Sequence, residues 1–319
     1  MNIKTINITL KAVTPIVMSG PDPQNIEFRI TEIKGMLRYW YRIRHFDKWG
    51  DLEALKDKES EMWGSTEKAS KVWLWGDVEG EVGKFCLAWQ KIGRKSVCVK
   101  VDGRTWGLDE DVEGVFRYWY AKTAYPVNTL VNLRVLLNEE VEEEFFKTLW
   151  AMLFLGGVGR RWKRGLGMLD IVLDNSDIPD EYRDYFNWRK RDDVNEFYCA
   201  GMNWVGISDL ISVHRCMNGK REMVYTIVRV LDEISDVCVR GKGENKRNFP
   251  IATKWFHVLE NGERLWLVHI DATRLYRLGK ENGVGRFLNC HAGKRGNVGN
   301  SQGGRNRRRG KSGKHSRGR

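Results

Sequence analysis

The sequence predicts an α+β fold built from two units, and three observations support this prediction. Within the first 173 residues, segments that alternate apolar and polar residues are separated by two stretches with the periodicity of a helix. Later in the chain, Asn261-Gly262 between two apolar stretches is a strong hairpin signal. Turn-forming residues, Asp174-Asn175-Ser176, lie between these parts. We therefore place domains at residues 1–174 and 175–290 of the 319-residue chain.

The first unit begins with a predicted strand and a predicted helix. Residues 3–17 alternate apolar and polar side chains, and a turn with glycine and proline follows at residues 19–23. In residues 29–44 the apolar side chains fill one broad arc at 100° per residue, which predicts an amphipathic helix. A short charged helix is expected at residues 53–62.

Four further strands are predicted in the first unit, at residues 71–75, 84–90, 96–101 and 128–137. We expect Gly76-Asp77 to end the first of these strands, because both residues disfavour a strand interior. Residues 102–127 are interpreted as an insertion.

A second helix is predicted over residues 139–155, with Asn138 as its N-cap. Its second half is apolar on nearly every side, which indicates burial. Gly156 is expected to end it as a C′ glycine, and a strand is expected at residues 166–173. The resulting order of strand, helix, strands, helix and strand is that of a ferredoxin-like βαββαβ unit.

Five glycines surround four cations and one tryptophan in residues 156–167, which we call the glycine-rich loop. A Walker loop is excluded because Leu166 follows Gly165, where that motif needs lysine, and a dinucleotide fingerprint is excluded because Trp162 stands at its third glycine. Glycines let backbone N–H groups approach an anion, cations supply charge and tryptophan can stack, so the loop suits a phosphate backbone. The alternative is a turn with a solvated basic tip. The candidate residues are Gly156, Gly157, Gly159, Arg160, Arg161, Trp162, Lys163, Arg164, Gly165 and Gly167.

A stripe of three cations lies along the first predicted helix. Lys34, Arg38 and Arg42 are spaced at i, i+4 and i+8 with no acid between them on that face. Like charges at this spacing repel by a few tenths of a kcal/mol per pair, so the stripe indicates an anionic partner. Three solvated cations on a surface helix are the alternative interpretation.

The formal net charge of +12 is concentrated at the C-terminal end. Residues 291–319 hold ten of the 54 Lys and Arg and no acid, so the remaining 44 cations face 42 acids. Local basic patches, and not the net charge, are therefore the indication of a polyanion partner. With eight glycines in 29 residues, the segment 291–319 is expected to be a disordered basic tail.

Several classes of protein are excluded by composition. The six cysteines form no C-x-x-C pair, so we expect no metal site, no cofactor and no disulfide framework. The N-terminus lacks the apolar region of a signal peptide, and the most apolar run, residues 149–158, is too short to cross a bilayer. A cytoplasmic protein without membrane contact is expected.

The second unit gives fewer signals. Helices are predicted near residues 179–191 and 221–237. The hairpin is predicted to pair residues 251–259 with residues 263–271.

Four segments of the first unit together form a pattern that spans residues 1–173. They are Val13-Thr14-Pro15-Ile16, Glu32-Ile33-Lys34-Gly35-Met36-Leu37-Arg38-Tyr39-Trp40-Tyr41-Arg42, Met62-Trp63-Gly64-Ser65 and Gly156-Gly157-Val158-Gly159-Arg160-Arg161. On these segments the first unit resembles the RAMP superfamily of CRISPR proteins, and within it the first-subunit family of the Cmr (type III-B) RNA-guided effectors.

The resemblance implies two tandem ferredoxin-like domains and a subunit without a catalytic centre, at one end of a complex for antiviral defence. Its implied partners are CRISPR RNA, single-stranded target RNA and other Cmr or RAMP subunits. The family pattern bears no bulky residue at Trp162, so stacking by that side chain is inferred from the residue type alone. The RNA contacts implied by carry-over are Lys34, Arg38, Arg42, Arg160, Arg161, Lys163 and Arg164.

Two alternatives remain open on the sequence. The first is a metal-independent endoribonuclease that processes precursor CRISPR RNA, with His45 as candidate general acid or base. No partner for His45 is evident near it in the sequence. The second is a scaffold subunit that makes no direct RNA contact.

Overall fold

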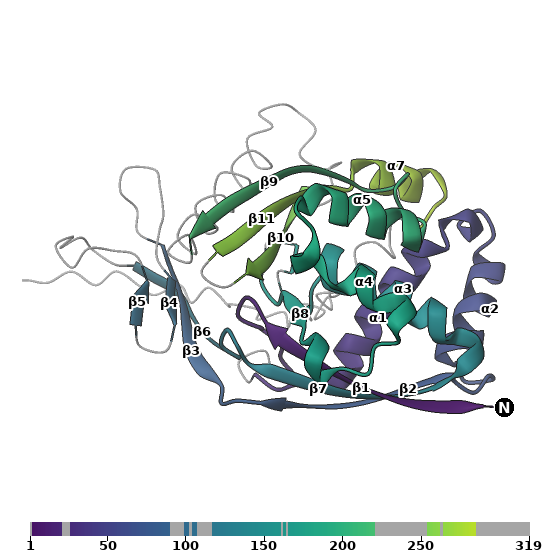
Figure 1. Ribbon diagram of the computed structural model, residues 1–319, viewed down its shortest axis with the longest axis horizontal. Helices are drawn as coiled ribbons and strands as arrows, with labels where there is room; N and C mark the ends of the chain where they lie inside the picture. Colours follow the sequence, from purple (N-terminus) through teal and green to yellow (C-terminus); the bar gives the residue numbers. More distant parts are fainter. Residues whose placement is uncertain are drawn as a thin grey trace, which may run out of the picture.

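The computed structural model describes residues 2–20, 26–89, 99–101, 104–106, 117–160, 162–163, 165–220, 254–261 and 264–284. These residues form a mixed α+β structure with three antiparallel sheets (Figure 1). The predicted α+β class is confirmed.

The central sheet has the strand order β2-β7-β1-β8, and all its neighbouring strands are antiparallel. Its inner face is apolar because side chains alternate along each strand. Ile6 of β1 lies opposite Val135 of β7, and Val135 lies opposite Leu74 of β2. The strands are β1 (Ile3–Ala12), β2 (Val72–Glu79), β7 (Leu130–Asn138) and β8 (Leu169–Ile171).

Helices cover one face of this sheet (Figure 1). Helix α1 (Ile30–Arg44) and the shorter α2 (Leu52–Trp63) connect β1 to β2, and α3 (Glu142–Leu155) connects β7 to β8. Strand order and connections are those of a βαββαβ unit.

Helix α3 is the core element of the molecule, as its all-round apolarity predicts. Every residue from Thr148 to Leu155 is buried. The Asn138 side chain accepts a hydrogen bond from the N–H of Glu140, and so caps a short 3₁₀ turn that leads into the helix. Gly156 does not end α3 in the left-handed conformation, since its φ is −122°. It is needed because a Cβ there would lie 2.4 Å from Nε1 of Trp40.

Two predictions about the strands that follow α2 need correction. Strand β2 continues through Gly76-Asp77, because Gly76 packs so closely on the carbonyl oxygen of Asn132 that a Cβ would lie 2.9 Å from it. The inserted part is also larger than residues 102–127, since it forms a separate sheet with the order β5-β4-β3-β6. Its strands are β3 (Gly83–Trp89), β4 (Val99–Val101), β5 (Arg104–Trp106) and β6 (Arg117–Ala124).

The second unit places helices on α3 and then a three-stranded sheet with the order β10-β11-β9. The predicted hairpin is confirmed as β10 (Lys254–Asn261) and β11 (Arg264–Asp271). The predicted helix at 179–191 is divided into α4 (Asp180–Phe186) and a 3₁₀ turn (Trp188–Lys190). The sequence interpretation missed α5 (Val194–Val205), β9 (Ser212–Lys220) and α7 (Thr273–Glu281). The predicted helix at 221–237 and the tail at 291–319 lie outside the described residues.

The two units share a continuous aromatic core. Gly201 of α5 packs against the indole of Trp150 on α3, and Nε1 of Trp150 donates to the carbonyl of Tyr185 at 2.8 Å. His257 of β10 is fully enclosed, and its Nδ1–H donates to the carbonyl of Gly156 at 3.2 Å. Burial lowers the pKa of His257 to about 3, so this ring is neutral. Within the part of the chain described here, no helix has the length and apolarity needed to cross a membrane.

Candidate nucleic-acid interface

Two arginines of the α1 stripe converge on one buried carboxylate. Nε of Arg38 lies 2.5 Å from Oε1 of Glu59, and Nε of Arg42 lies 2.6 Å from Oε2 of the same residue. Glu59 comes from α2 and is 4% exposed. No acid is interleaved in the stripe on α1 itself, but the neighbouring helix α2 supplies one.

The stripe nevertheless keeps an excess of positive charge. Burial alone would raise the pKa of Glu59, but hydrogen bonds and charge from Arg42 and Arg38 outweigh it and hold that pKa below its usual value. One carboxylate cannot neutralise two guanidinium groups, whose side chains are 34% and 25% exposed. Burial and the charge of Arg38 both lower the pKa of Lys34, the third cation.

Glu59→Gln is expected to lower the free energy of unfolding by about 2 kcal/mol, because two partly buried guanidinium groups lose their counter-ion. The pKa of Glu59 is depressed in the folded state, so its contribution is present above the unfolded-state pKa and lost as pH falls through the folded one. The free energies of unfolding of wild type and variant, measured in urea, should therefore become more similar below about pH 4.

A matched control for this variant is Glu61→Gln on the same helix. Glu61 is 61% exposed and its nearest cation, Lys68, is 3.9 Å away. This control should change stability by less than about 0.5 kcal/mol. Equal losses in the two variants would contradict the role assigned to Glu59.

The backbone of the glycine-rich loop is largely occupied by internal hydrogen bonds. The N–H of Arg160 donates to the carbonyl of Val17 at 2.7 Å, and the N–H of Gly167 donates to the carbonyl of Pro15 at 2.9 Å. The N–H groups of Val158 and Gly165 donate to carbonyls of the loop itself. The predicted backbone cradle for a phosphate is thus wrong at these four positions, and RNA contact falls to the side chains.

Close packing explains the glycines of the loop. A Cβ at Gly159 would lie 2.6 Å from the Val17 carbonyl oxygen, and one at Gly167 would lie 1.8 Å from that of Val158. Gly157 packs on Gly167 and the Trp162 side chain, and Gly165 has a positive φ of 79°. The glycines therefore fold the loop onto the segment after β1.

Trp162 is buried, which corrects its prediction as a base-stacking residue. It is 2% exposed and packs among the rings of Tyr39, Trp40 and Trp255, with ring centroids 5.9, 6.3 and 5.5 Å away. Two of these rings belong to α1 and one to β10. The side chain thus joins the two units at their boundary.

Lys163 is also turned inward, toward the second unit. Its Nζ lies 5.2, 5.5 and 5.0 Å from the ring centroids of Trp162, Trp255 and Tyr276, and it donates to the hydroxyl of Tyr276. Cation–π attraction and this hydrogen bond hold Lys163 against α7. The assignment of Lys163 as an RNA contact is corrected accordingly.

Arg160 is the half-buried loop cation that lies next to α1. Its charge acts on Glu32, whose carboxylate also accepts the N–H of Gly159. Burial raises the pKa of Glu32, and Arg29, Arg160 and the Gly159 N–H oppose that rise. The structure therefore brings Arg160 beside the helix that carries Lys34, Arg38 and Arg42. Arg161 and Arg164 lie outside the described residues.

His45 has a carboxylate partner that the sequence did not reveal. Its Nδ1–H donates to the carbonyl of Tyr41 at 2.9 Å, and its Nε2 lies 3.4 Å from Oε1 of Glu144. The same oxygen accepts a 2.7 Å hydrogen bond from Arg44. Burial lowers the pKa of His45, against the hydrogen bond to Tyr41 and the charge of Glu144. The ring is 13% exposed and stacks on Tyr41.

Sequence patterns missed the acids that organise this region. Glu59 and Glu32 are two among 42 acids, and no local pattern distinguishes them.

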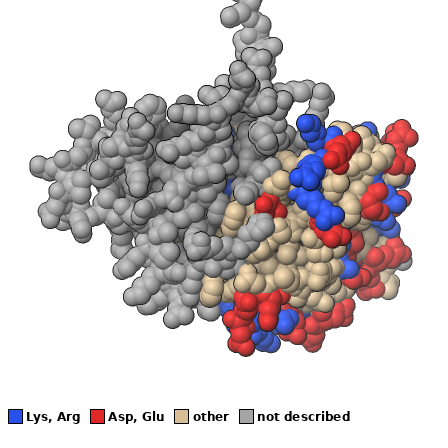
Figure 2. Space-filling view, turned by 90° about the horizontal axis from the view of Figure 1, so that it is seen from above, with Lys and Arg blue, Asp and Glu red and all other residues tan. Residues whose placement is uncertain are grey.

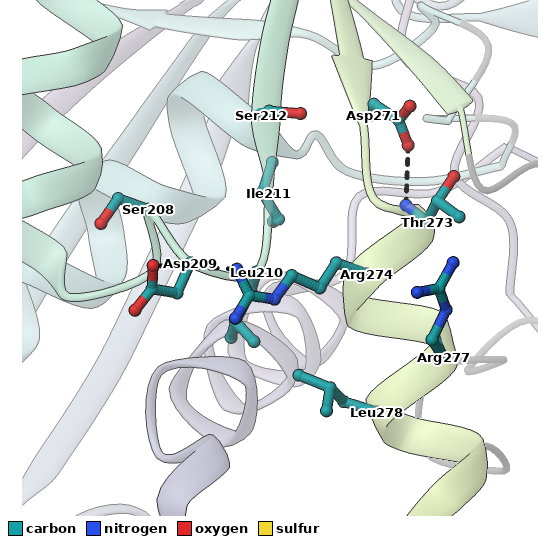
Figure 3. Close-up of a pocket in the computed structure, with 10 residues that line it drawn as sticks. All are labelled: Ser208, Asp209, Leu210, Ile211, Ser212, Asp271, Thr273, Arg274, Arg277 and Leu278. Carbon is teal, nitrogen blue, oxygen red and sulfur yellow. Dashed lines mark hydrogen bonds and ion pairs between the residues drawn. The ribbon is translucent and has the colours of Figure 1, made fainter.

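The sequence does carry a recognisable signal for a pair of arginines in the second unit. Arg274 and Arg277 stand at i and i+3 on the amphipathic helix α7. They line a pocket of about 450 Å³ between α7 and residues 208–212 (Figure 3).

Charged side chains of both signs are mixed over the face of the molecule that bears α7. Figure 2 shows this face, with a group of cationic side chains beside the edge of the described part. Among the residues described, no cluster of three or more His, Cys, Asp or Glu could hold a metal ion.

Comparison with known proteins decides the family. A sequence model of the RAMP superfamily matches residues 9–170, which span β1 to β8 and include both α1 and the glycine-rich loop. The chain belongs to the RAMP superfamily. Most of the residues that match the RAMP model belong to the βαββαβ unit, so the family assignment is consistent with the observed fold.

Two curated RAMP relatives come from Pyrococcus furiosus. The chain is 28% identical to CRISPR system Cmr subunit Cmr1-2 over 186 residues, which are 51% of this chain and 93% of that protein. It is 26% identical to Cmr subunit Cmr1-1 over 226 residues, which are 69% of this chain and 61% of the relative.

Solved structures share the fold of this RAMP protein. The crystal structure of apo Cmr1 from Pyrococcus furiosus matches with a TM-score of 0.51 and 16% identity, over 85% of this chain and 87% of that one. A chain in the cryo-EM structure of the type III-B Cmr-beta complex, bound to cognate target RNA and AMPPnP in the presence of single-stranded DNA, also matches with a TM-score of 0.51, at 13% identity. That match covers 88% of this chain and 99% of the other.

Proposed function

We propose that this chain is a non-catalytic RNA-binding subunit of a type III-B CRISPR (Cmr) effector complex. In this proposal it contacts CRISPR RNA, target RNA or both at one end of the complex, in antiviral defence, and other Cmr subunits are its protein partners. Support comes from its RAMP family and from its similarity to two Cmr1 proteins. The proposal includes a second ferredoxin-like domain at residues 175–290, for which the strand order β10-β11-β9 is the support.

The observation that carries RNA binding is the surplus of cations where α1 meets the glycine-rich loop. Glu59 balances only one of Arg38 and Arg42, and Lys34 lies next along the same stripe. Arg160 adds a cation from the loop, and the acid next to it, Glu32, also has Arg29 beside it. Guanidinium groups donate several hydrogen bonds in a fixed plane and suit phosphate oxygens. We assign phosphate contacts to Lys34, Arg38, Arg42 and Arg160, with Arg161 and Arg164 added from the sequence.

Replacing Arg160 and Arg161 together by alanine is expected to weaken binding of single-stranded RNA and to flatten its salt dependence. Each lost phosphate contact reduces the slope of log K against log salt by about 0.7. Fluorescence anisotropy with a labelled 20-nucleotide RNA at several salt concentrations measures this slope.

The control for this variant replaces Lys190 and Arg191, two adjacent exposed cations after α4. Its slope should stay close to the wild-type value. If both double variants keep the wild-type slope, the loop is not part of an RNA interface, and the scaffold alternative is favoured.

The endoribonuclease alternative depends on His45 and is disfavoured by its surroundings. Nδ1 of His45 is bound to a main-chain carbonyl, and Nε2 faces a carboxylate that Arg44 shares. A general acid or base must come within hydrogen-bonding reach of the RNA. Incubation of the protein with labelled precursor RNA, without added metal, should return intact RNA. Discrete products that disappear in His45→Ala would overturn the non-catalytic assignment.

A further inference from the structure

The pocket beside α7 has the size and lining of a small-ligand site. Its volume is about 450 Å³, within the range of about 300–1,000 Å³ common for such sites. One wall is α7, and the other is the loop that runs from α5 into β9, as Figure 3 shows. Hydroxyl groups of Ser208 and Ser212 and apolar side chains of Ile211 and Leu278 complete the lining.

Two arginines and two aspartates line the pocket, and among the described residues Arg277 is the cation that offers an anion a free partner. Arg277 is exposed and has no hydrogen bond or ion pair with any residue in the described part of the chain. Arg274 lies 3.9 Å from Asp209, and both side chains are mostly exposed, so this pair is weak. Asp271 is engaged, because its carboxylate accepts the N–H of Thr273 at 2.8 Å (Figure 3). The positive end of the α7 dipole adds to the field of the arginines.

Helix α7 links this pocket to the glycine-rich loop. Tyr276 lies directly before Arg277, and its hydroxyl receives the hydrogen bond from Lys163 of the loop. The Tyr276 ring also packs against Trp255, at 6.3 Å between centroids. The helix that carries Arg274 and Arg277 is therefore held by the same aromatic contacts that hold the loop.

We propose that this pocket binds one nucleotide of a single-stranded RNA, with Arg277 as the main ligand of its phosphate and Arg274 as the second. This inference rests on the proposed RNA-binding function and extends the interface to the second unit. A nucleotide fits better than a lone carboxylate, because its sugar can meet the serine hydroxyls and its base can cover the half-buried side chain of Leu278. A carboxylate would leave most of the volume unfilled.

Isothermal titration calorimetry with adenosine 5′-monophosphate tests the pocket directly. Wild-type protein should give saturable heat, and Arg277→Gln should weaken the affinity about tenfold, as loss of a charge-assisted hydrogen bond does. Arg274→Gln should have a smaller effect. Lys280→Gln is the matched control, since Lys280 is an exposed cation on the same helix that does not line the pocket. Absence of saturable binding, or equal affinity in wild type and Arg277→Gln, overturns the proposal.

Anisotropy with the 20-nucleotide RNA separates this inference from the proposed function. If Arg277→Gln weakens RNA binding and Lys280→Gln does not, the nucleotide in the pocket belongs to bound RNA. If the Arg160 and Arg161 variant binds RNA normally while Arg277→Gln does not, the pocket stands and the loop assignment fails. If Arg277→Gln spares AMP and RNA binding but prevents co-purification of other subunits, the pocket is a protein contact and the proposal is wrong.

Discussion

Replacing Trp162 by alanine is expected to lower the free energy of unfolding by about 3–5 kcal/mol, the usual cost of removing a buried aromatic side chain. Trp162 is 2% exposed and lies among Tyr39, Trp40 and Trp255, so its removal leaves a cavity between the units. It also removes one of the three rings around Lys163. Urea unfolding followed by far-UV circular dichroism measures the loss.

Trp162→Phe and Trp75→Ala serve as controls for this prediction. Phenylalanine keeps part of the packing, so Trp162→Phe should cost clearly less than alanine. Trp75 is 51% exposed on β2, and its replacement by alanine should cost less than about 1 kcal/mol. If Trp162→Ala instead retained full stability and lost only RNA affinity, Trp162 would be a stacking residue on the surface, and the burial described here would be wrong.

The fold of the first unit follows closely from local sequence patterns. Alternation in β1 and β7 and the apolar arcs of α1 and α3 each depend on residues near one another in the chain. These elements form where the patterns predict them, although β1 ends at Ala12 and not at residue 17. The hairpin at Asn261-Gly262 was predictable for the same reason. Local periodicity is informative because each element must bury one face.

The sequence interpretation failed where the structure of a segment depends on residues far away in the chain. Gly76 is locally a strand breaker, yet β2 continues through it, because the close approach to Asn132 on β7 requires a glycine. The α1 stripe looked uncompensated because Glu59 lies 17 residues beyond Arg42. A helical projection of α1 cannot contain a carboxylate from α2.

Composition alone could not separate binding residues from packing residues in the glycine-rich loop. Tryptophan and lysine are suited both to stacking on RNA and to a buried cation–π contact. Trp162 and Lys163 have the second role, because α7 and β10 bring Tyr276 and Trp255 to them from more than 90 residues away in the chain. Arg160, two residues before Trp162, has no such aromatic contact among the described residues.

Replacing Gly167 by alanine is expected to destabilise the protein by about 4 kcal/mol or more, at the upper end of the range for single substitutions. Two costs combine. The φ of Gly167 is +65°, where a Cβ is strained by about 1–2 kcal/mol. The added Cβ would also lie 1.8 Å from the carbonyl oxygen of Val158, so the backbone must move. That movement breaks the 2.9 Å hydrogen bonds from Gly167 to Pro15 and from Val158 to Gly167.

Gly206→Ala separates these two costs, since Gly206 has a similar φ of +76° at the end of α5 but no atom within 4 Å of an added Cβ. It should cost about 1 kcal/mol in urea unfolding. If the two alanine variants were equally stable, close packing of the loop would not be the reason for Gly167. A much larger loss of stability in Gly167→Ala than in Gly206→Ala would mean that close packing on the segment after β1 requires this loop glycine. The arginine side chains would then be the part of the loop left to bind RNA.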